Sequence, residues 1–396
     1  GAALNSLADD VMCDGDKAFR AVDDLFRPKA EENTYFHPPL RLVLSDYPDF
    51  SGIERYEENV GAADDRASVE VDLYEEFPSP GEYAVFLGID VGSTSTKAVL
   101  ASPSGAVLAG FYTRTAGQPV AATQRILAAL ESLASRKFLS LSILGAGTTG
   151  SGRKFIGKII GADLVVDEIT AHARAAVELR PDADTIIEIG GQDSKFTTLK
   201  NGAVTFSVMN HVCAAGTGSF IEEQAQRLGC PLSDYATRTE NRRAPITSDR
   251  CTVFMERDIN HHLNAGYGID EALAAALHAI VENYLSKVAV EASIGKTILF
   301  QGATAKNRAL VAAFEQRLGR PIHVSKFCHL TGAWGGALMM ADAKMVRSRF
   351  RGFGLHRLRI PIASEVCGLC NNRCKITVAD VEGEKVAFGF LCGRDY

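Results

Sequence analysis

The chain has 396 residues, of which 46% are hydrophobic and 23% charged, and its formal net charge is −6. This composition is typical of a folded protein of two or three domains, and it excludes collagen, a wholly disordered chain and a disulfide-stapled miniprotein. We find no apolar run long enough to span a membrane, no signal peptide and no dense Lys/Arg block, so we expect a cytoplasmic protein that binds neither membranes nor nucleic acid.

The charge is unevenly distributed along the chain. Residues 1–83 contain 20 acidic and 7 basic residues and 6 of the 13 prolines, so their net charge is −13, whereas the rest of the chain carries +7. We interpret 1–83 as an acidic, extended and partly ordered connector, with a possible short helix around Asp16–Phe26. Residues 84–342 then alternate β-rich runs, glycine turns and helical stretches, which predicts an α/β fold.

Two similar segments lie 100 residues apart. LGIDVGSTSTKAVL (87–100) and IEIGGQDSKFTTL (187–199) each predict a strand, a glycine-rich polar turn and a second strand. Such turns present backbone N–H groups to phosphates, so the pair predicts two lobes that face one nucleotide. We expect Asp90 to hold Mg²⁺ through water, and Gln192 and Asp193 to orient the attacking water and the metal. The phosphate-binding candidates are Gly92, Ser93, Thr94, Ser95 and Lys97 in the first turn, and Gly190 and Gly191 in the second.

A third segment, ILFQGATAKN (298–307), predicts a strand, a turn of small residues and then a helix through Ala309–Leu318. Ligands of α/β folds bind at such strand-to-helix junctions. We therefore expect Gly302, Ala303, Lys306 and Asn307 to contact the adenosine of a nucleotide.

These segments together resemble the sugar kinase, actin and chaperone ATPase superfamily. More narrowly, the chain resembles the activator ATPases of the 2-hydroxyacyl-CoA dehydratases and benzoyl-CoA reductases. This resemblance rests on GIDVGSTSTKAV (88–99), GTTGSGR (147–153), DEITAHARAA (167–176), IGGQDSK (189–195), MNHVCAAGTGSF (209–220), CTVF-E (251–256) and GATAKN (302–307). It implies a two-lobed, actin-like ATPase of duplicated ribonuclease H-like domains over 84–342, with nucleotide contacts also at Gly216 and Gly218. The family usually has a second glycine where this chain has Ala303, whose methyl group crowds the adenosine site.

Two cysteines, Cys213 and Cys251, lie near predicted helix N-termini, where the helix dipole favours anions such as thiolate-bound clusters. The alternative is that both are small buried residues. The resemblance implies that they hold a 4Fe-4S cluster shared by two subunits, with two cysteines from each, or by two copies in one longer chain. We interpret Cys230 and Cys328 as core residues.

Residues 343–359 look like a basic linker, and 360–396 like a small Cys-rich β module that is truncated at its end. Cys367, Cys370, Cys374 and Cys392 fit a four-thiolate shell on two short strands joined by a Glu-Gly turn. Zn²⁺ and a second Fe–S cluster fit equally well, and the alternative is four unassigned thiols.

The leading functional hypothesis follows from the resemblance. It implies an ATPase that hydrolyses MgATP to drive a low-potential electron from its cluster to an Fe–S dehydratase- or reductase-like partner, with ferredoxin or flavodoxin as electron donor. Two alternatives remain open: a small-molecule kinase of the same superfamily, and a non-catalytic nucleotide-binding module of a larger chain.

Overall fold

A computed structural model describes residues 35–44, 46–60, 68–77, 80–210 and 215–392 of the chain. Residues His37–Tyr396 form one unit. The expected helix around Asp16–Phe26, Cys13 and Cys213 lie outside the described residues. In the described part of the chain, no helix has the length and apolar character needed to cross a membrane.

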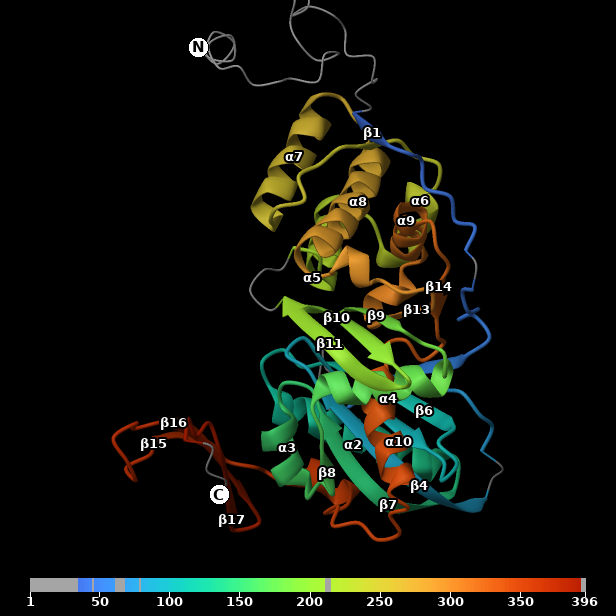
Figure 1. Cartoon of the computed structure of the whole chain (residues 1–396). Coiled ribbons are helices and arrows are strands. Elements are labelled where there is room, and N and C mark those ends of the chain that lie inside the picture. Colours follow the sequence, from blue (N-terminus) through green and yellow to red (C-terminus); the bar gives the residue numbers. More distant parts are fainter. Residues whose placement is uncertain (1–34, 45, 61–67, 78–79, 211–214, 393–396) are drawn as a thin grey trace, which may run out of the picture. The chain divides into compact units, whose positions relative to one another are not determined.

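The first lobe is built on a seven-stranded sheet with the strand order β2-β3-β6-β5-β4-β7-β8 (Figure 1). Its strands are β2 (Glu54–Asn59), β3 (Ser68–Leu73), β4 (Gly81–Val91), β5 (Ser95–Ala101), β6 (Val107–Arg114), β7 (Leu139–Thr149) and β8 (Leu164–Val165). The second lobe is built on a five-stranded sheet with the order β11-β10-β9-β13-β14. Its strands are β9 (Thr185–Ile189), β10 (Ser194–Lys200), β11 (Ala203–Asn210), β13 (Ile298–Gln301) and β14 (Ile322–Val324). The short strands β1 (Phe36–His37) and β12 (Ala244–Pro245) belong to neither sheet.

The two sheets repeat one topology. In the first lobe, β4, β5 and β6 pair antiparallel, and β7 and β8 then add parallel to β4. In the second lobe, β9, β10 and β11 pair antiparallel, and β13 and β14 add parallel to β9. The two glycine-rich segments of the sequence are the β4–β5 and β9–β10 hairpins, so each begins its own copy of the repeated unit.

Helices fill the connections between these strands. They are α2 (Pro119–Arg136), α3 (Arg153–Ile160), α4 (Glu168–Leu179), α5 (Gly218–Arg227), α6 (Tyr235–Thr239), α7 (Thr252–Asn264), α8 (Ile269–Lys287), α9 (Arg308–Leu318) and α10 (Thr331–Asp342). Two of the predicted helices are confirmed: α5 begins at Gly218, and α9 covers the predicted segment Ala309–Leu318.

Helix α10 crosses from the second half of the chain into the first lobe, where it packs on β4, β5 and β7 and against α4 (Figure 1, orange). The approach is close enough to require glycine at two positions. A Cβ atom at Gly88 on β4 would lie 1.9 Å from the carbonyl oxygen of Ala333, and one at Gly335 would lie 1.8 Å from that of Ala171. Helix α4 also contacts β10 and β11, so the α4–α10 contact links the two lobes.

The N-terminal segment contributes to both lobes. Leu40 and Leu42 are buried in the hydrophobic core of the second lobe, whereas β2 and β3 extend the sheet of the first lobe. In β3, Val69 and Val71 face the core and alternate with polar residues, which is the pattern of a strand with one buried face. The domain boundaries stay a prediction, but the part of 1–83 from His37 onward is thus integrated into the fold, beyond the connector that its composition indicated.

The basic linker is also held against the first lobe. Asp163 accepts hydrogen bonds from the Ser348 hydroxyl and the Arg349 amide, and the Gln124 amide donates to the Leu355 carbonyl at 3.0 Å. His356 lies 2.7 Å from Glu131. These contacts fix the chain along the outside of α2 and α3.

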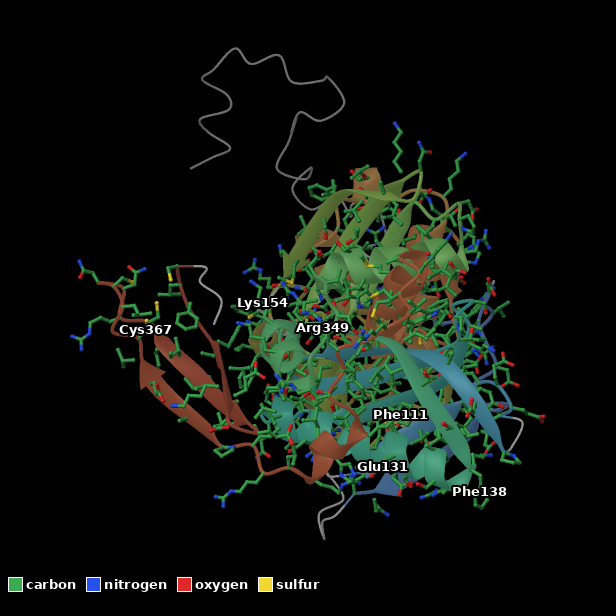
Figure 2. All side chains as sticks on the ribbon, turned by 90° about the horizontal axis from the view of Figure 1, so that it is seen from below. Phe111, Glu131, Phe138, Lys154, Arg349 and Cys367 are labelled. Atoms are coloured by element: carbon green, nitrogen blue, oxygen red, sulfur yellow. The ribbon has the colours of Figure 1, made fainter. Side chains whose placement is uncertain are left out.

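A three-stranded antiparallel sheet follows the linker. It consists of β15 (Ile362–Val366), β16 (Lys375–Val381) and β17 (Glu384–Phe388), with the predicted Glu-Gly turn between the last two. Val381 and Val386 join the hydrophobic core of the first lobe, and the rings of Phe155 and Phe388 lie 6.2 Å apart. Figure 2 shows Cys367 on this sheet.

Candidate functional site

A cleft of about 700 Å³ runs between the hairpin turns of the two lobes. Fifteen of the predicted nucleotide-binding and catalytic residues line it: Asp90, Gly92, Ser93, Thr94, Ser95, Lys97, Gly190, Gly191, Gln192, Asp193, Gly218, Gly302, Ala303, Lys306 and Asn307. Gly216 is not among the lining residues; it has a φ of +77° and lies against α8. Segments that are up to about two hundred residues apart in the sequence therefore meet at one site.

The turns of the β4–β5 and β9–β10 hairpins, Gly92–Ser95 and Gly190–Asp193, are called the phosphate-loop turns below. They have the same internal geometry and touch each other. The Gly92 amide donates to the Ser95 carbonyl at 3.0 Å, and the Gly190 amide donates to the Asp193 carbonyl at 2.9 Å. A Cβ atom at Gly191 would lie 2.6 Å from Thr94 Oγ1, so only glycine permits this approach. The turns of the two lobes are therefore in direct contact.

Several buried polar atoms at these turns have no hydrogen-bond partner among the described residues: Asp90 Oδ1, Thr94 Oγ1 and Ser194 Oγ. Buried polar atoms are rarely left unpaired, and an unpaired group costs about 1–3 kcal/mol. Asp90 and Thr94 line the cleft, and an unpaired carboxylate oxygen and an unpaired hydroxyl group there suit a divalent cation with phosphate oxygens. The residues present therefore fit Mg²⁺ and a polyphosphate.

Lys97 lies next to this carboxylate, with its Nζ 3.2 Å from Asp90 Oδ2. Burial is the largest single influence and opposes the charge of the ammonium group, but the attraction of Asp90, Tyr112 and Glu168 together outweighs it, so the pKa of Lys97 is raised. The Lys97 side chain therefore remains cationic in the cleft, where it balances Asp90 and attracts phosphate.

A buried ion cluster beside the second turn was not predicted from the sequence. Lys195 is 1% exposed, and its Nζ lies 3.0 Å from Glu188, 3.1 Å from Glu168 and 3.2 Å from Asp193. Burial, and then the neighbouring Glu188, raise the pKa of Glu168 to about 7. The signal was present in the motifs IGGQDSK and DEITAHARAA, but only the fold brings α4, β9 and β10 together.

Glu168, His172 and Glu188 form the one group of three or more potential metal ligands, within 4.8 Å of one another, among the described residues. The Lys195 ammonium already bridges the two carboxylates, and His172 Nδ1 lies 2.7 Å from Gln301 Oε1. These residues thus satisfy one another, so the group is better explained as an ion cluster than as a metal site.

The C-terminal cysteines do not form a group of this kind. Cys367 and Cys374 are buried, whereas Cys370 and Cys392 are exposed. The Leu391 amide donates to Cys374 Sγ at 3.3 Å. These thiols are not among the groups of described residues that could hold a single metal ion, and metal binding by this sheet stays a prediction. Cys230 and Cys328 are buried in the core of the second lobe, as expected.

Cys251 lies at the N-cap of α7, is partly exposed and makes no capping hydrogen bond with its side chain. The side chain of Asn283 contacts Arg250, the neighbour of Cys251, and also lies against Gly216. Asn283 Nδ2 donates to the Arg250 carbonyl at 3.0 Å, and a Cβ atom at Gly216 would lie 2.9 Å from Asn283 Oδ1. Gly216 and Arg250, which are near Cys213 and Cys251 in the sequence, therefore both lie against Asn283 of α8.

Helix α5 connects this region to the cleft. The amides of Gly218 and Ser219, at its N-terminus, donate to the carbonyls of Gly190 and Gly191, each at 2.9 Å. The second phosphate-loop turn is thus hydrogen-bonded to the helix that directly follows the Cys213 segment.

Two lobes of one repeated topology, with facing phosphate-loop turns, define an ATPase of the actin-like fold. The chain belongs to the BadF/BadG/BcrA/BcrD ATPase family, whose sequence profile matches residues 87–341. It is similar to the activator of lactoyl-CoA dehydratase from Anaerotignum propionicum, with 34% identity over 65% of this chain and 97% of that protein. It is also 33% identical to the (R)-2-hydroxyglutaryl-CoA dehydratase activating ATPase of Acidaminococcus fermentans, over 64% of this chain and 95% of the relative.

The solved structures agree with these sequence relationships. The activator of the 2-hydroxyisocaproyl-CoA dehydratase from Clostridium difficile, with bound ADPNP, superimposes with a TM-score of 0.58 and 30% identity. That comparison covers 65% of this chain and 95% of the other. The predicted family and the predicted two-lobed fold are confirmed.

Proposed function

We propose that this chain binds MgATP in the cleft and hydrolyses it to activate an Fe–S enzyme of the 2-hydroxyacyl-CoA dehydratase or benzoyl-CoA reductase kind. The observation that carries the proposal is the pair of facing turns with unpaired Asp90 Oδ1, Thr94 Oγ1 and Ser194 Oγ. The relatives' names and the ADPNP complex of the C. difficile activator support it.

Each lobe has its own part in this site. In the first lobe, Asp90 would hold Mg²⁺, and Gly92–Thr94 together with Lys97 would hold the phosphates. From the second lobe, Gln192 and Asp193 would orient the attacking water, and the loop Gly302–Asn307 would hold the adenosine. Bound ATP would hold the two turns together. Loss of its terminal phosphate would weaken the contact between the turns and allow the two lobes to move apart.

We further propose that Cys251 and Cys213 contribute half of a 4Fe-4S site. Two cysteines per chain leave the four-thiolate shell incomplete, so a second copy, either in a homodimer or in tandem, supplies the other two. The bound cluster would supply single-electron chemistry, with a ferredoxin or flavodoxin as donor. Because α5 is hydrogen-bonded to the second phosphate-loop turn, movement of that turn would reach the Cys213 segment directly.

Two measurements on the anaerobically purified chain test the proposal. ATP hydrolysis is expected from the wild type and should fall at least about 100-fold in Asp193→Asn, because the attacking water loses its carboxylate partner. Asp182→Asn, at an exposed ion pair outside the cleft, is the matched control. Unchanged hydrolysis in Asp193→Asn would overturn the assigned role, and a phosphorylated small-molecule acceptor would indicate a kinase instead.

Iron and sulfide content, together with the oligomer mass, test the cluster. About two irons per chain in a dimer are expected for a bridging 4Fe-4S cluster. Cys251→Ser should abolish it, whereas Cys230→Ser, at a buried cysteine outside the site, should not. Equal iron in both variants would contradict ligation by Cys251.

A further inference from the structure

The cleft extends beyond the phosphate-loop turns to a pocket wall that β3 provides. Side chains alternate along a strand, so Ser68, Glu70 and Asp72 share the face opposite to Val69 and Val71. Ser68 and Glu70 line the cleft, and Asp72 lies one step further along the same face. Strand β3 lies outside the span 87–341 that the family profile matches.

His329 lies between this wall and the adenosine loop. It also lines the cleft, is 6% exposed, and directly follows Cys328, whose carbonyl accepts a 2.8 Å hydrogen bond from the Gly302 amide. Lys306 of the adenosine loop also lines the cleft. Burial lowers the pKa of His329 to about 4, because the hydrogen bond to Asp72, which raises it, is offset in part by the positive charge of Lys306. The ring is thus neutral near pH 7.

Asp72 fixes which ring nitrogen carries the proton. His329 Nε2 lies 3.4 Å from Asp72 Oδ2. Asp72 also accepts hydrogen bonds from Arg55 at 2.5 and 3.0 Å and from the Tyr74 hydroxyl at 3.2 Å. A carboxylate held by these donors stays ionised and only accepts, so Nε2 of His329 bears the hydrogen and Nδ1 bears a lone pair.

This lone pair is unused within the described chain. His329 Nδ1 is buried and has no hydrogen-bond partner among the described residues. Buried acceptors are usually paired, and because His329 lines the cleft, a donor on a bound ligand would satisfy this one. Lys306, by contrast, offers only donors. The lining of the cleft therefore includes one acceptor, at His329, and one donor, at Lys306.

The geometry points to His329 and Lys306 as the residues that select adenine in the bound nucleotide, with His329 held in the required tautomer by Asp72. This inference rests on the proposed binding of ATP. Adenine presents a donor at its 6-amino group and an acceptor at N1, which matches an acceptor at Nδ1 and a donor at Lys306 Nζ. Guanine and hypoxanthine present an acceptor at position 6 and a donor at N1, so both would face like groups.

Equilibrium binding of ADP, IDP and GDP by calorimetry tests the inference without relying on turnover. IDP differs from ADP at position 6 and N1 only, so it isolates the contacts in question. We expect the wild type to bind ADP at least about tenfold more tightly than IDP or GDP. IDP and GDP would lose a hydrogen bond to the protein and would place an acceptor against His329 Nδ1. His329→Leu should reduce ADP affinity about tenfold and leave IDP affinity within about twofold.

Asp72→Asn tests the tautomer. An asparagine amide can donate to Nε2, so the ring proton can move to Nδ1, which then suits a position-6 oxygen. The ADP-to-IDP preference should therefore shrink or invert, while His329 itself is retained. This variant also keeps the test informative if His329→Leu does not fold.

His278→Leu is the matched control. His278 is likewise buried, with an unpaired Nε2, but it stacks on His37 outside the cleft. Its replacement should leave the ADP-to-IDP ratio unchanged. Equal binding of ADP and IDP by the wild type, or an unchanged ratio in both His329→Leu and Asp72→Asn, would overturn the inference while leaving ATP binding intact. Failure of all three nucleotides to bind would overturn the proposed function as well.

Discussion

The amide of Asn283 donates a 3.0 Å hydrogen bond to the carbonyl of Arg250, which directly precedes Cys251. The same amide donates to the Asp249 carbonyl, and its oxygen faces Gly216 in the segment that follows Cys213. One residue of α8, 2% exposed, thus contacts Arg250, next to Cys251, and lies against Gly216.

We predict that Asn283→Ala lowers the free energy of unfolding by about 2–3 kcal/mol, because two buried hydrogen bonds and the packing of the amide are lost. If Cys213 and Cys251 hold one cluster, iron content should fall as well, since Asn283 no longer positions Gly216 and Arg250 relative to each other. Chemical denaturation and iron analysis measure the two effects. Gln224→Leu is a suitable control, because that buried amide has no partner among the described residues; equal effects in the two variants would contradict a role for Asn283.

Two adjacent glycines of α10 should respond oppositely to alanine. At Gly335 the added Cβ would lie 1.8 Å from the Ala171 carbonyl oxygen of α4, whereas at Gly336 nothing lies within 4 Å. We expect Gly335→Ala to lower stability by about 3 kcal/mol through forced separation of α4 and α10. Gly336→Ala should raise it by about 0.5–1 kcal/mol, because alanine favours the helix. Thermal unfolding of the pair checks this, and similar melting temperatures would disprove the close contact.

Much of the site was predictable from the sequence, for reasons visible at particular residues. Gly190 and Gly191 mark a turn wherever a backbone must approach a ligand closely, and the strand on either side carries its own apolar pattern. The turn at Gly92 follows the same logic. Local patterns of this kind specify hairpins, and the repeated order of motifs specified that two hairpins share one cleft.

Lys195 and its carboxylates were missed because no local pattern encodes them. Glu168 begins a helix, Glu188 lies near the end of a strand, and their pairing with one lysine depends on how three elements pack. Strands β2 and β3 were missed for a different reason. The alternation of Val69 and Val71 with acidic residues was present, but the acidic and proline-rich composition around it favoured a connector.

Glu168 should make stability depend on pH. Burial, and then Glu188, raise its pKa from 4.5 to about 7, so the folded chain holds a proton that the unfolded chain loses above pH 4.5. The resulting stabilisation is complete below pH 4.5 and is lost as the pH rises through about 7. Because the side chain is 24% exposed, we expect a loss of about 2 kcal/mol.

Glu168→Gln removes this titration. The free energy of unfolding of the wild type, measured by urea denaturation from pH 4.5 to 8, should therefore fall relative to that of the variant. A difference that stays constant across this range, or that grows in favour of the wild type, would refute the raised pKa.

The N-terminal segment reaches the adenosine loop through Tyr47. Its hydroxyl donates to the carbonyls of Ala305 at 3.1 Å and Lys306 at 2.8 Å. We predict that Tyr47→Phe loosens this loop, lowering stability by about 1 kcal/mol and ADP affinity several-fold. Tyr56→Phe is the matched control, because its buried hydroxyl has no partner among the described residues. Unchanged ADP affinity in Tyr47→Phe would show that the contact does not support the loop.

The course of residues 37–73 has a practical consequence for dissecting this protein. A fragment cut at the start of the matched family span would lose Leu40 and Leu42 from the core of one lobe, and β2 and β3 from one side of the other sheet. The freed edge of β6 would then be open to pairing with other chains. Recombinant fragments should therefore begin before His37, and aggregation of shorter ones would report a missing strand rather than an unstable ATPase.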